Sequence, residues 1–327
     1  MPPLLPLGSS LRGRYRIHRT LHQSRLRNLY IAEDQHLRGK FWVVKEMQPV
    51  GVDHGDRARL LALFQAEALQ VSALEHPHLP KLVDFFSQEG CLYLIREFIP
   101  GTDLATALQT RGSLAETEAL RIGAQLCDLL AYLWTRKLPS GIHRDLRLSN
   151  MVLTGDGQIK VLDVGFGRLL GGRGSESMGA PDYAAPEQFT GEVGADTRTL
   201  VYNVGALLYH MLTGMNPGSS PFNLPPVEEL RPGLATVTRS ILTKALKNHP
   251  ADRPGSLQEL RRGLDKALAA AARRPGRPTE SEERPGERQE RTASGSGGGA
   301  WAWVLGTLLT ALMGGALVVL YQMFLQS

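Results

Sequence analysis

The first hundred residues alternate short apolar runs with polar turns, a pattern typical of β-strands. We predict strands over residues 15–20, 29–33, 40–46, 82–86 and 91–98. Between the third and fourth strands, apolar residues recur at spacings of three and four over residues 57–75, which predicts a single helix. His76-Pro77 follows it, and the residue before a proline disfavours the helical conformation, so the helix is expected to end there.

Beyond residue 100 the apolar spacing becomes mostly helical. We predict helices over residues 116–137, 199–213, 234–247 and 256–272. A block of strands followed by a block of helices predicts an α+β protein with two lobes. The expected N-lobe, residues 15–98, has a small antiparallel sheet and one helix, and the expected C-lobe, residues 99–272, is mainly helical. Residues 1–14 are predicted to be a leader outside these lobes.

The chain ends in two segments of opposite character. Residues 273–299 combine proline and glycine with alternating Arg and Glu, so they cannot bury a core, and we predict a flexible linker. Residues 300–323 carry no charge, and a helix of this length, about 33 Å over its apolar part, would cross the hydrocarbon layer of a membrane. We therefore predict a single transmembrane helix here.

Two further features bear on that predicted span. Arginines are frequent in the linker, and such residues favour the cytoplasmic side, so the preceding domain is expected in the cytoplasm. Small residues recur at every fourth position of the span, a spacing that can pair helices. They are also common in spans that do not pair, so a homodimer through this helix stays open. The small residues are Ala302, Gly306, Thr310 and Gly314.

Composition excludes several classes of protein. The 327 residues are 42% hydrophobic and 21% charged, as in ordinary globular proteins, and the net charge is +5. Because no basic stripe is interleaved with aromatic residues, nucleic acid is not expected as a partner. Cys91 and Cys127 have no Cys or His at metal-ligand spacing, which favours buried thiols over a metal site.

Several polar residues that could take part in a reaction lie in the stretch IHRDLRLSN, residues 142–150. Asn150 follows Asp145 after five residues, and Asp163 follows after a predicted hairpin. One carboxylate can accept a hydroxyl proton, while Asn and Asp offer the hard oxygen ligands that Mg²⁺ prefers. This is the set that phosphoryl transfer requires.

In these motifs the chain resembles the protein kinases, and the motif sequences are most similar to those of bacterial serine/threonine kinases of the eukaryotic type. Lys45 ends WVVK as the family's lysine ends VAIK, and Glu67 lies in FQAEALQ where the family carries a helix glutamate. The triplet at 185–187 matches the family's APE, with Arg253 as its usual ion-pair partner. The resemblance extends from about residue 15 to residue 268.

The resemblance implies a membrane-tethered kinase that transfers the ATP γ-phosphoryl group to Ser or Thr of protein substrates. It makes Asp145 the acceptor of the hydroxyl proton, with Arg147 as a cation near the transferring phosphate. Lys45 would bind phosphates and pair with Glu67, while Asn150 and Asp163 would hold Mg²⁺ or Mn²⁺. The other positions expected against ATP are Ser24, Leu29, Val43, Glu97 and Val152.

Several positions depart from the family. The three glycines of the phosphate-covering loop are replaced by His22, Ser24 and Arg27. Side chains there should loosen the phosphate cradle, and Arg25 and Arg27 either supply charge in its place or fill the pocket. Arg96 and Leu200 stand where the family has an apolar residue and an aspartate. These changes keep a second reading open: a pseudokinase that acts as a membrane-anchored scaffold.

Overall fold

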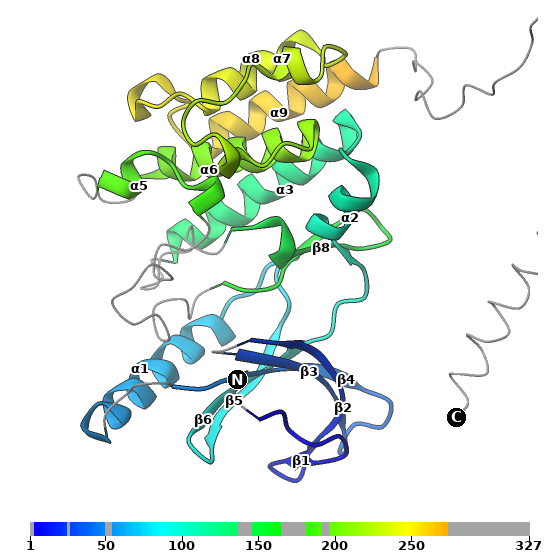
Figure 1. Ribbon diagram of the computed structural model, residues 1–327, viewed down its shortest axis with the longest axis vertical. Helices are drawn as coiled ribbons and strands as arrows, with labels where there is room; N and C mark the ends of the chain where they lie inside the picture. Colours follow the sequence, from blue (N-terminus) through cyan, green and yellow to red (C-terminus); the bar gives the residue numbers. More distant parts are fainter. Residues whose placement is uncertain are drawn as a thin grey trace, which may run out of the picture. The chain divides into compact units, whose positions relative to one another are not determined.

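The computed structural model describes residues 3–24, 27–49, 54–136, 146–164, 181–190 and 196–273. These belong to the first of two compact units, residues 1–275. Figure 1 shows two lobes in this unit, one built on a curved sheet and the other on packed helices. The predicted α+β fold with two lobes is confirmed for the described residues.

The N-terminal lobe is a six-stranded antiparallel sheet with the strand order β1-β2-β3-β4-β6-β5. Its strands are β1 (Ser10–Leu11), β2 (Tyr15–Gln23), β3 (Arg27–Asp34), β4 (Phe41–Met47), β5 (Leu82–Gln88) and β6 (Cys91–Glu97). Successive side chains of a strand point to opposite faces, so β4 turns Val43, Lys45 and Met47 one way and Val44 and Glu46 the other. The helix α1 (His54–Ser72) packs on the face of Met47 through Phe64 and Ala68.

The other face of this sheet shows that part of the predicted leader belongs to the lobe. Leu11 pairs with Tyr15 in the β1–β2 ladder and is only 3% exposed. The backbone N–H of Leu5 donates to the hydroxyl of Tyr30 at 3.2 Å. The prediction of a separate leader over residues 1–14 is therefore wrong for this stretch, because its apolar side chains cover a sheet face that would otherwise meet water.

The C-terminal lobe is mainly helical. Its helices are α2 (Leu104–Arg111), α3 (Glu116–Thr135), α5 (Glu187–Thr190), α6 (Thr197–Thr213), α7 (Val227–Leu230), α8 (Thr236–Ala245) and α9 (Leu257–Ala272). A small sheet joins β7 (Thr102–Asp103), β8 (Met151–Leu153) and β9 (Ile159–Val161) in that order. All residues of α6 from Thr199 to Leu212 are buried except His210, so this helix forms the centre of the lobe.

Most predicted elements are present with ends shifted by a few residues. The short helices α2, α5 and α7 were not predicted, because four to eight residues carry too little periodicity to be recognised. Among the described residues, none of the helices is both long and apolar enough to cross a membrane. The predicted span, 300–323, lies outside the described residues, as does the predicted linker except for Arg273.

A buried carboxylate closes the turn between β3 and β4. Asp34 accepts hydrogen bonds from Arg14 Nη2 at 2.8 Å, from the indole Nε1 of Trp42 at 2.8 Å and from the backbone N–H of His36 at 2.9 Å. Its side chain is 0% exposed. Burial alone would raise the pKa of Asp34, but the hydrogen bonds from Arg14 and Trp42 outweigh it and hold that pKa well below its usual range.

This depressed pKa predicts a pH-dependent contribution to folding. Asp34→Asn is expected to lower the free energy of unfolding at pH 7 by about 1.5–3 kcal/mol, because it weakens charge-assisted hydrogen bonds in a buried site. Since the ionised form stabilises the native state, the difference from wild type should shrink below about pH 4, where the unfolded aspartate takes up a proton. Urea denaturation at pH 7 and pH 3 measures both effects.

The matched control is Glu33→Gln, on the neighbouring position of β3. Glu33 pairs with Arg16, but the two side chains are 31% and 53% exposed. Its loss should change the free energy of unfolding by less than about 1 kcal/mol. An Asp34→Asn deficit of the same size at pH 7 and pH 3 would contradict the role given to the ionised carboxylate.

Candidate active site

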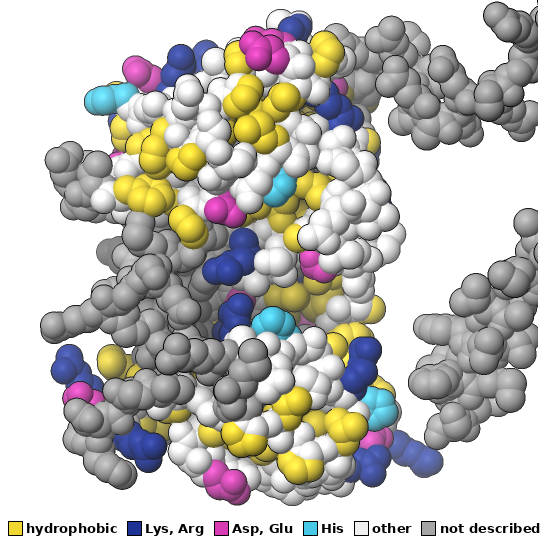
Figure 2. All heavy atoms as spheres, viewed as in Figure 1, with side chains coloured by type: hydrophobic (Ala, Val, Ile, Leu, Met, Phe, Trp, Pro, Cys, Tyr) yellow, Lys and Arg dark blue, Asp and Glu magenta, His cyan; other side chains and the backbone are white. Residues whose placement is uncertain are grey.

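An ion pair joins the two lobes where the predicted site residues meet. The ammonium of Lys45, on the inner face of β4, lies 2.8 Å from Oδ1 and 2.7 Å from Oδ2 of Asp163. Asp163 lies two residues after the end of β9, so residues far apart in sequence meet here. The side chains are only 7% and 16% exposed. Figure 2 shows the molecule hollowed between its lobes, with Lys and Arg side chains bordering the hollow.

The charges around Asp163 keep it ionised. Burial would raise the pKa of this carboxyl, but the positive charges of Lys45, Arg96 and Arg27 outweigh the effect, and the pKa is lowered. Asp163 is therefore an anion at neutral pH. Such a carboxylate can bind either a metal ion or basic side chains.

The first residue of β3 places a second cation on Asp163. Nη1 of Arg27 lies 3.4 Å from Asp163 Oδ2. Ser24 and Arg27, at two of the family's glycine positions, hold each other: the Ser24 hydroxyl donates to the Arg27 carbonyl at 2.8 Å, and the Arg27 N–H donates to the Ser24 hydroxyl at 3.2 Å. The Ser24 hydroxyl, predicted to face ATP, thus bonds to the backbone of Arg27.

A third cation comes from β6. Arg96 is opposite Val43 in the β4–β6 register, and its guanidinium donates to the carbonyl of Leu162. Burial lowers the pKa of Arg96. A cavity of about 40 Å³ is lined by Lys45, Arg96 and Asp163 together with apolar side chains. The contact with Leu162 was not predicted, although the alternation of β6 indicates an inward-facing Arg96.

The positions predicted against the base of ATP lie on elements around this ion pair. Val43 is buried on β4, and Leu29 of β3 is opposite Lys45 in the register. Val152 is buried on β8 of the other lobe. Glu97 ends β6, and its side chain accepts a hydrogen bond from the N–H of Lys81 at 3.3 Å.

A glycine brings the chain after β6 close to β8. Gly101 has φ +151°, and a Cβ on it would lie 2.5 Å from both the Leu153 carbonyl oxygen and Cγ1 of Val152. Only a residue without a side chain allows this approach. Gly101 therefore fixes the spacing between the connection of the lobes and Val152, one of the positions predicted to lie against ATP.

The two predicted metal ligands lie on neighbouring backbone segments. Asn150 ends the short 3₁₀ helix η2 (Leu148–Asn150), and Asp163 follows Leu162. The N–H of Leu162 donates to the Asn150 carbonyl at 2.7 Å, which keeps the segments together. A carboxylate and an amide are hard oxygen donors of the kind that Mg²⁺ accepts, so these residues fit the ion.

Of the remaining predicted site residues, the structure describes Glu67 and Arg147 but not Asp145. Glu67 lies on α1 and is 8% exposed; its pairing with Lys45 stays a prediction. Arg147 precedes η2, near enough to Tyr183 for its charge to act on the phenol. Asp145, the expected proton acceptor, lies outside the described residues.

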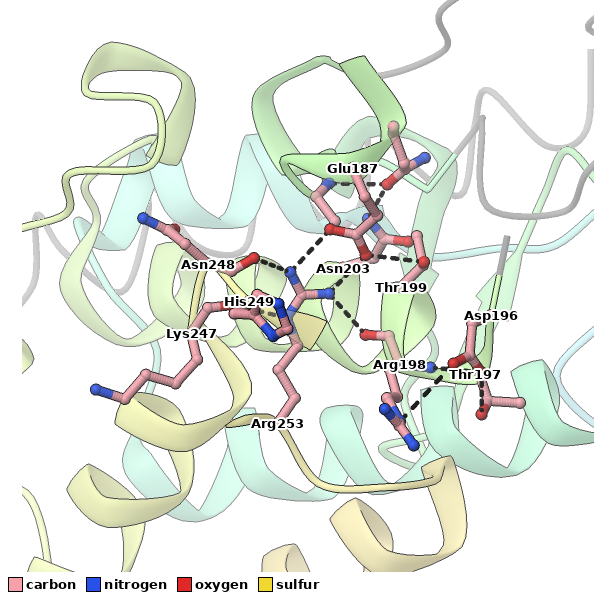
Figure 3. Close-up of polar contacts among 12 residues, drawn as sticks. Glu187, Asp196, Thr197, Arg198, Thr199, Asn203, Lys247, Asn248, His249 and Arg253 are labelled. Atoms are coloured by element: carbon pink, nitrogen blue, oxygen red, sulfur yellow. Dashed lines mark hydrogen bonds and ion pairs between the residues drawn. The ribbon is translucent and has the colours of Figure 1, made fainter. Parts of the chain in front are cut away.

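The predicted pair of Glu187 and Arg253 is present and deeply buried (Figure 3). The guanidinium makes two parallel contacts with the carboxylate, at 2.6 and 2.8 Å, and the side chains are 0% and 9% exposed for Arg253 and Glu187. Arg253 also donates to the carbonyls of Lys247 and Asn248, while the Thr199 hydroxyl donates to Glu187. The pair therefore ties α5 to α6 and to the turn before α9.

One polar anchor on α6 was not predicted. Nδ2 of Asn203 donates to the Tyr183 carbonyl at 2.7 Å and to Gln188 Oε1 at 2.9 Å. Leu200, one turn earlier, is fully buried in the apolar core. The helix thus holds the segment around Tyr183 through Asn203. These hydrogen bonds could not be predicted from the sequence, because a single Asn in an apolar helix does not indicate which groups it will contact.

Comparison with known proteins agrees with this geometry. The model of the protein kinase domain family matches residues 31–261. Serine/threonine-protein kinase PrkC of Bacillus subtilis is 25% identical over 279 residues, covering 81% of this chain and 42% of the relative. Serine/threonine-protein kinase pkn2 of Myxococcus xanthus is 30% identical over 293 residues, covering 82% of this chain and 34% of the relative.

Among solved structures, the kinase domain of Mycobacterium tuberculosis PknI matches with a TM-score of 0.63 and 28% identity, covering 81% of this chain and 100% of that one. The chain spans less than half the length of PrkC and of pkn2. The family model nevertheless covers most of the chain. The chain therefore belongs to the protein kinase family, and within it is similar to bacterial serine/threonine protein kinases of the PrkC and PknB type.

Proposed function

We propose that this protein transfers the γ-phosphoryl group of ATP to Ser or Thr side chains of protein substrates. The observation that carries the proposal is the contact of Lys45 with both carboxylate oxygens of Asp163 in the hollow between the lobes. It brings a phosphate-binding cation and a metal-binding anion to one point. The names of the similar proteins support the same activity and the choice of Ser and Thr.

Each residue then has a defined task. Lys45 binds phosphate oxygens, while the carboxylate of Asp145 orients the substrate hydroxyl and accepts its proton. Asn150 and Asp163 would hold Mg²⁺ or Mn²⁺, which, when bound with ATP, neutralises charge on the phosphates. Arg147 adds a cation beside the transferring group. Val43 and Val152 provide apolar surfaces for the base.

We further propose that the domain is tethered to a membrane on the cytoplasmic side. The support is the apolar, uncharged stretch 300–323 and the arginines that precede it. A homodimer through the small residues of that stretch is part of the same proposal. Recovery of the full-length protein in the membrane fraction, with release to the soluble fraction on deletion of 300–323, is the expected result.

Phosphate transfer tests the catalytic proposal. Full-length protein with Mg-ATP is expected to label a Ser/Thr protein substrate faster than the Asp145→Asn variant, which keeps the shape of the side chain but cannot accept the proton. Radiolabelled γ-phosphate incorporation, followed by identification of the phosphorylated residue, is the measurement. Transfer by the wild type no faster than by Asp145→Asn would exclude kinase activity.

A second candidate function is a pseudokinase that acts as a membrane-anchored scaffold. The observation that favours it is the contact of Arg27 with Asp163, which engages a predicted metal ligand. Melting of the full-length protein separates the cases, since ATP at a hundredfold excess over its Kd should stabilise a nucleotide-binding protein by about 2.7 kcal/mol. Stabilisation by Mg-ATP that Asp163→Ala removes would count against a scaffold that binds no nucleotide.

A further inference from the structure

Three basic side chains surround one carboxylate in the hollow between the lobes. Lys45 and Arg27 both contact Asp163, and Arg96 contributes a third positive charge beside it. These four groups sum to an excess of positive charge. In addition, the Nε of Arg96 is buried and has no acceptor within the described part of the chain. The cluster therefore favours an additional anion.

Arg27 is the member of this cluster that an entering ligand can reach. Its side chain is 34% exposed, against 7% for Lys45. The hydrogen bonds with Ser24 fix its backbone at the start of β3, where the family's third glycine would lie. A guanidinium presents a fork of N–H donors that matches phosphate oxygens in pairs. Its position and its chemistry both suit a polyphosphate.

We propose that this cleft binds the polyphosphate of a nucleotide through Arg27 and Lys45 without a divalent metal ion, Arg27 supplying the charge that the metal otherwise provides. The inference deepens the proposed function and rests on nucleotide use of this cleft. It concerns binding alone. Transfer still uses Asn150 and Asp163, so a metal ion stays necessary for catalysis but not for affinity.

The two cations in contact with Asp163 explain why nucleotide binding need not depend on a metal ion. A divalent cation that approaches Asp163 meets two cations already in contact with that carboxylate, and like charges at such distances repel. A polyphosphate is repelled by the Asp163 carboxylate but attracted by both Lys45 and Arg27, so the positive charge of the pair prevails. Anion binding is thus favoured before any metal ion is present.

Titration calorimetry with ATP on the full-length protein, in EDTA and then in MgCl₂, tests this inference. The wild type is expected to bind ATP in EDTA, with Mg²⁺ changing Kd by less than about tenfold. Arg27→Gly, which restores the family's residue, should weaken binding in EDTA by about tenfold or more and make it depend on Mg²⁺. Arg27→Gln keeps a side chain in place and should show the same loss, so a folding defect of the glycine variant does not decide the result.

Arg19→Gln is the matched control, because Arg19 lies exposed on β2 and its replacement removes the same charge. It should leave ATP binding in EDTA within about twofold of wild type. Binding that appears only with Mg²⁺, or Arg27 variants no weaker than Arg19→Gln in EDTA, would overturn the inference while leaving phosphate transfer intact. Failure of the kinase proposal has a different signature: ATP binds, but transfer does not exceed that of Asp145→Asn.

Discussion

Replacing Arg253 with alanine is expected to lower the free energy of unfolding by about 3–5 kcal/mol, because the change leaves the Glu187 carboxylate buried without its partner. The pair is bidentate, and the guanidinium is completely shielded from solvent. Burial alone would raise the pKa of Glu187, and the hydrogen bonds from Arg253 lower it instead. Chemical denaturation of both proteins at pH 7 measures the loss.

An exposed pair at the start of α6, close to the Glu187–Arg253 pair, provides the comparison (Figure 3). Arg198 lies 3.7 Å from Asp196, and the two side chains are 40% and 46% exposed. Arg198→Ala should cost less than about 1 kcal/mol, since water screens such pairs. Equal losses for Arg253→Ala and Arg198→Ala would show that burial does not govern the energy of the Glu187 pair.

Replacing Lys45 with methionine is expected to slow phosphate transfer by about 10²–10³-fold while the protein stays folded. Methionine fills much of the same space on β4, but it removes the cation that contacts both oxygens of Asp163. The variant therefore lacks the positive charge that would stabilise the negative charge developing on the phosphates during transfer. Initial rates at saturating Mg-ATP, with a melting curve for each protein, give the answer.

Lys40→Met serves as its control. Lys40 is exposed before β4, with its ammonium 4.8 Å from the ring centre of Trp42, and it lies outside the proposed site. Its transfer rate should stay within about twofold of wild type, as for surface changes away from a site. A Lys45→Met protein that transfers phosphate at the Lys40→Met rate would remove Lys45 from the mechanism.

The two-lobed fold could be predicted from the sequence because its periodicities are local. The Phe, Trp and Val residues before Lys45 predict a strand, and the spacing of apolar residues in α6 and α9 predicts helices. The pairing of Glu187 with Arg253 could also be predicted, but it came from the motif resemblance and not from local periodicity. Short helices such as α5 escape this kind of prediction, since their packing rather than their own spacing makes them helical.

The sequence by itself determined which groups this protein has for chemistry: a strand lysine, hard oxygen donors after a catalytic-loop motif, and arginines in place of glycine and of an apolar residue. Only the tertiary structure decided how these groups are combined. It pairs Arg27 with Asp163, and it forms the hydrogen bonds from Arg96 to the Leu162 carbonyl and from Asn203 to the Tyr183 carbonyl. The physical reason is that charge and hydrogen-bond interactions depend on distance in space, and the distance between residues of different lobes is fixed by packing rather than by their spacing along the chain.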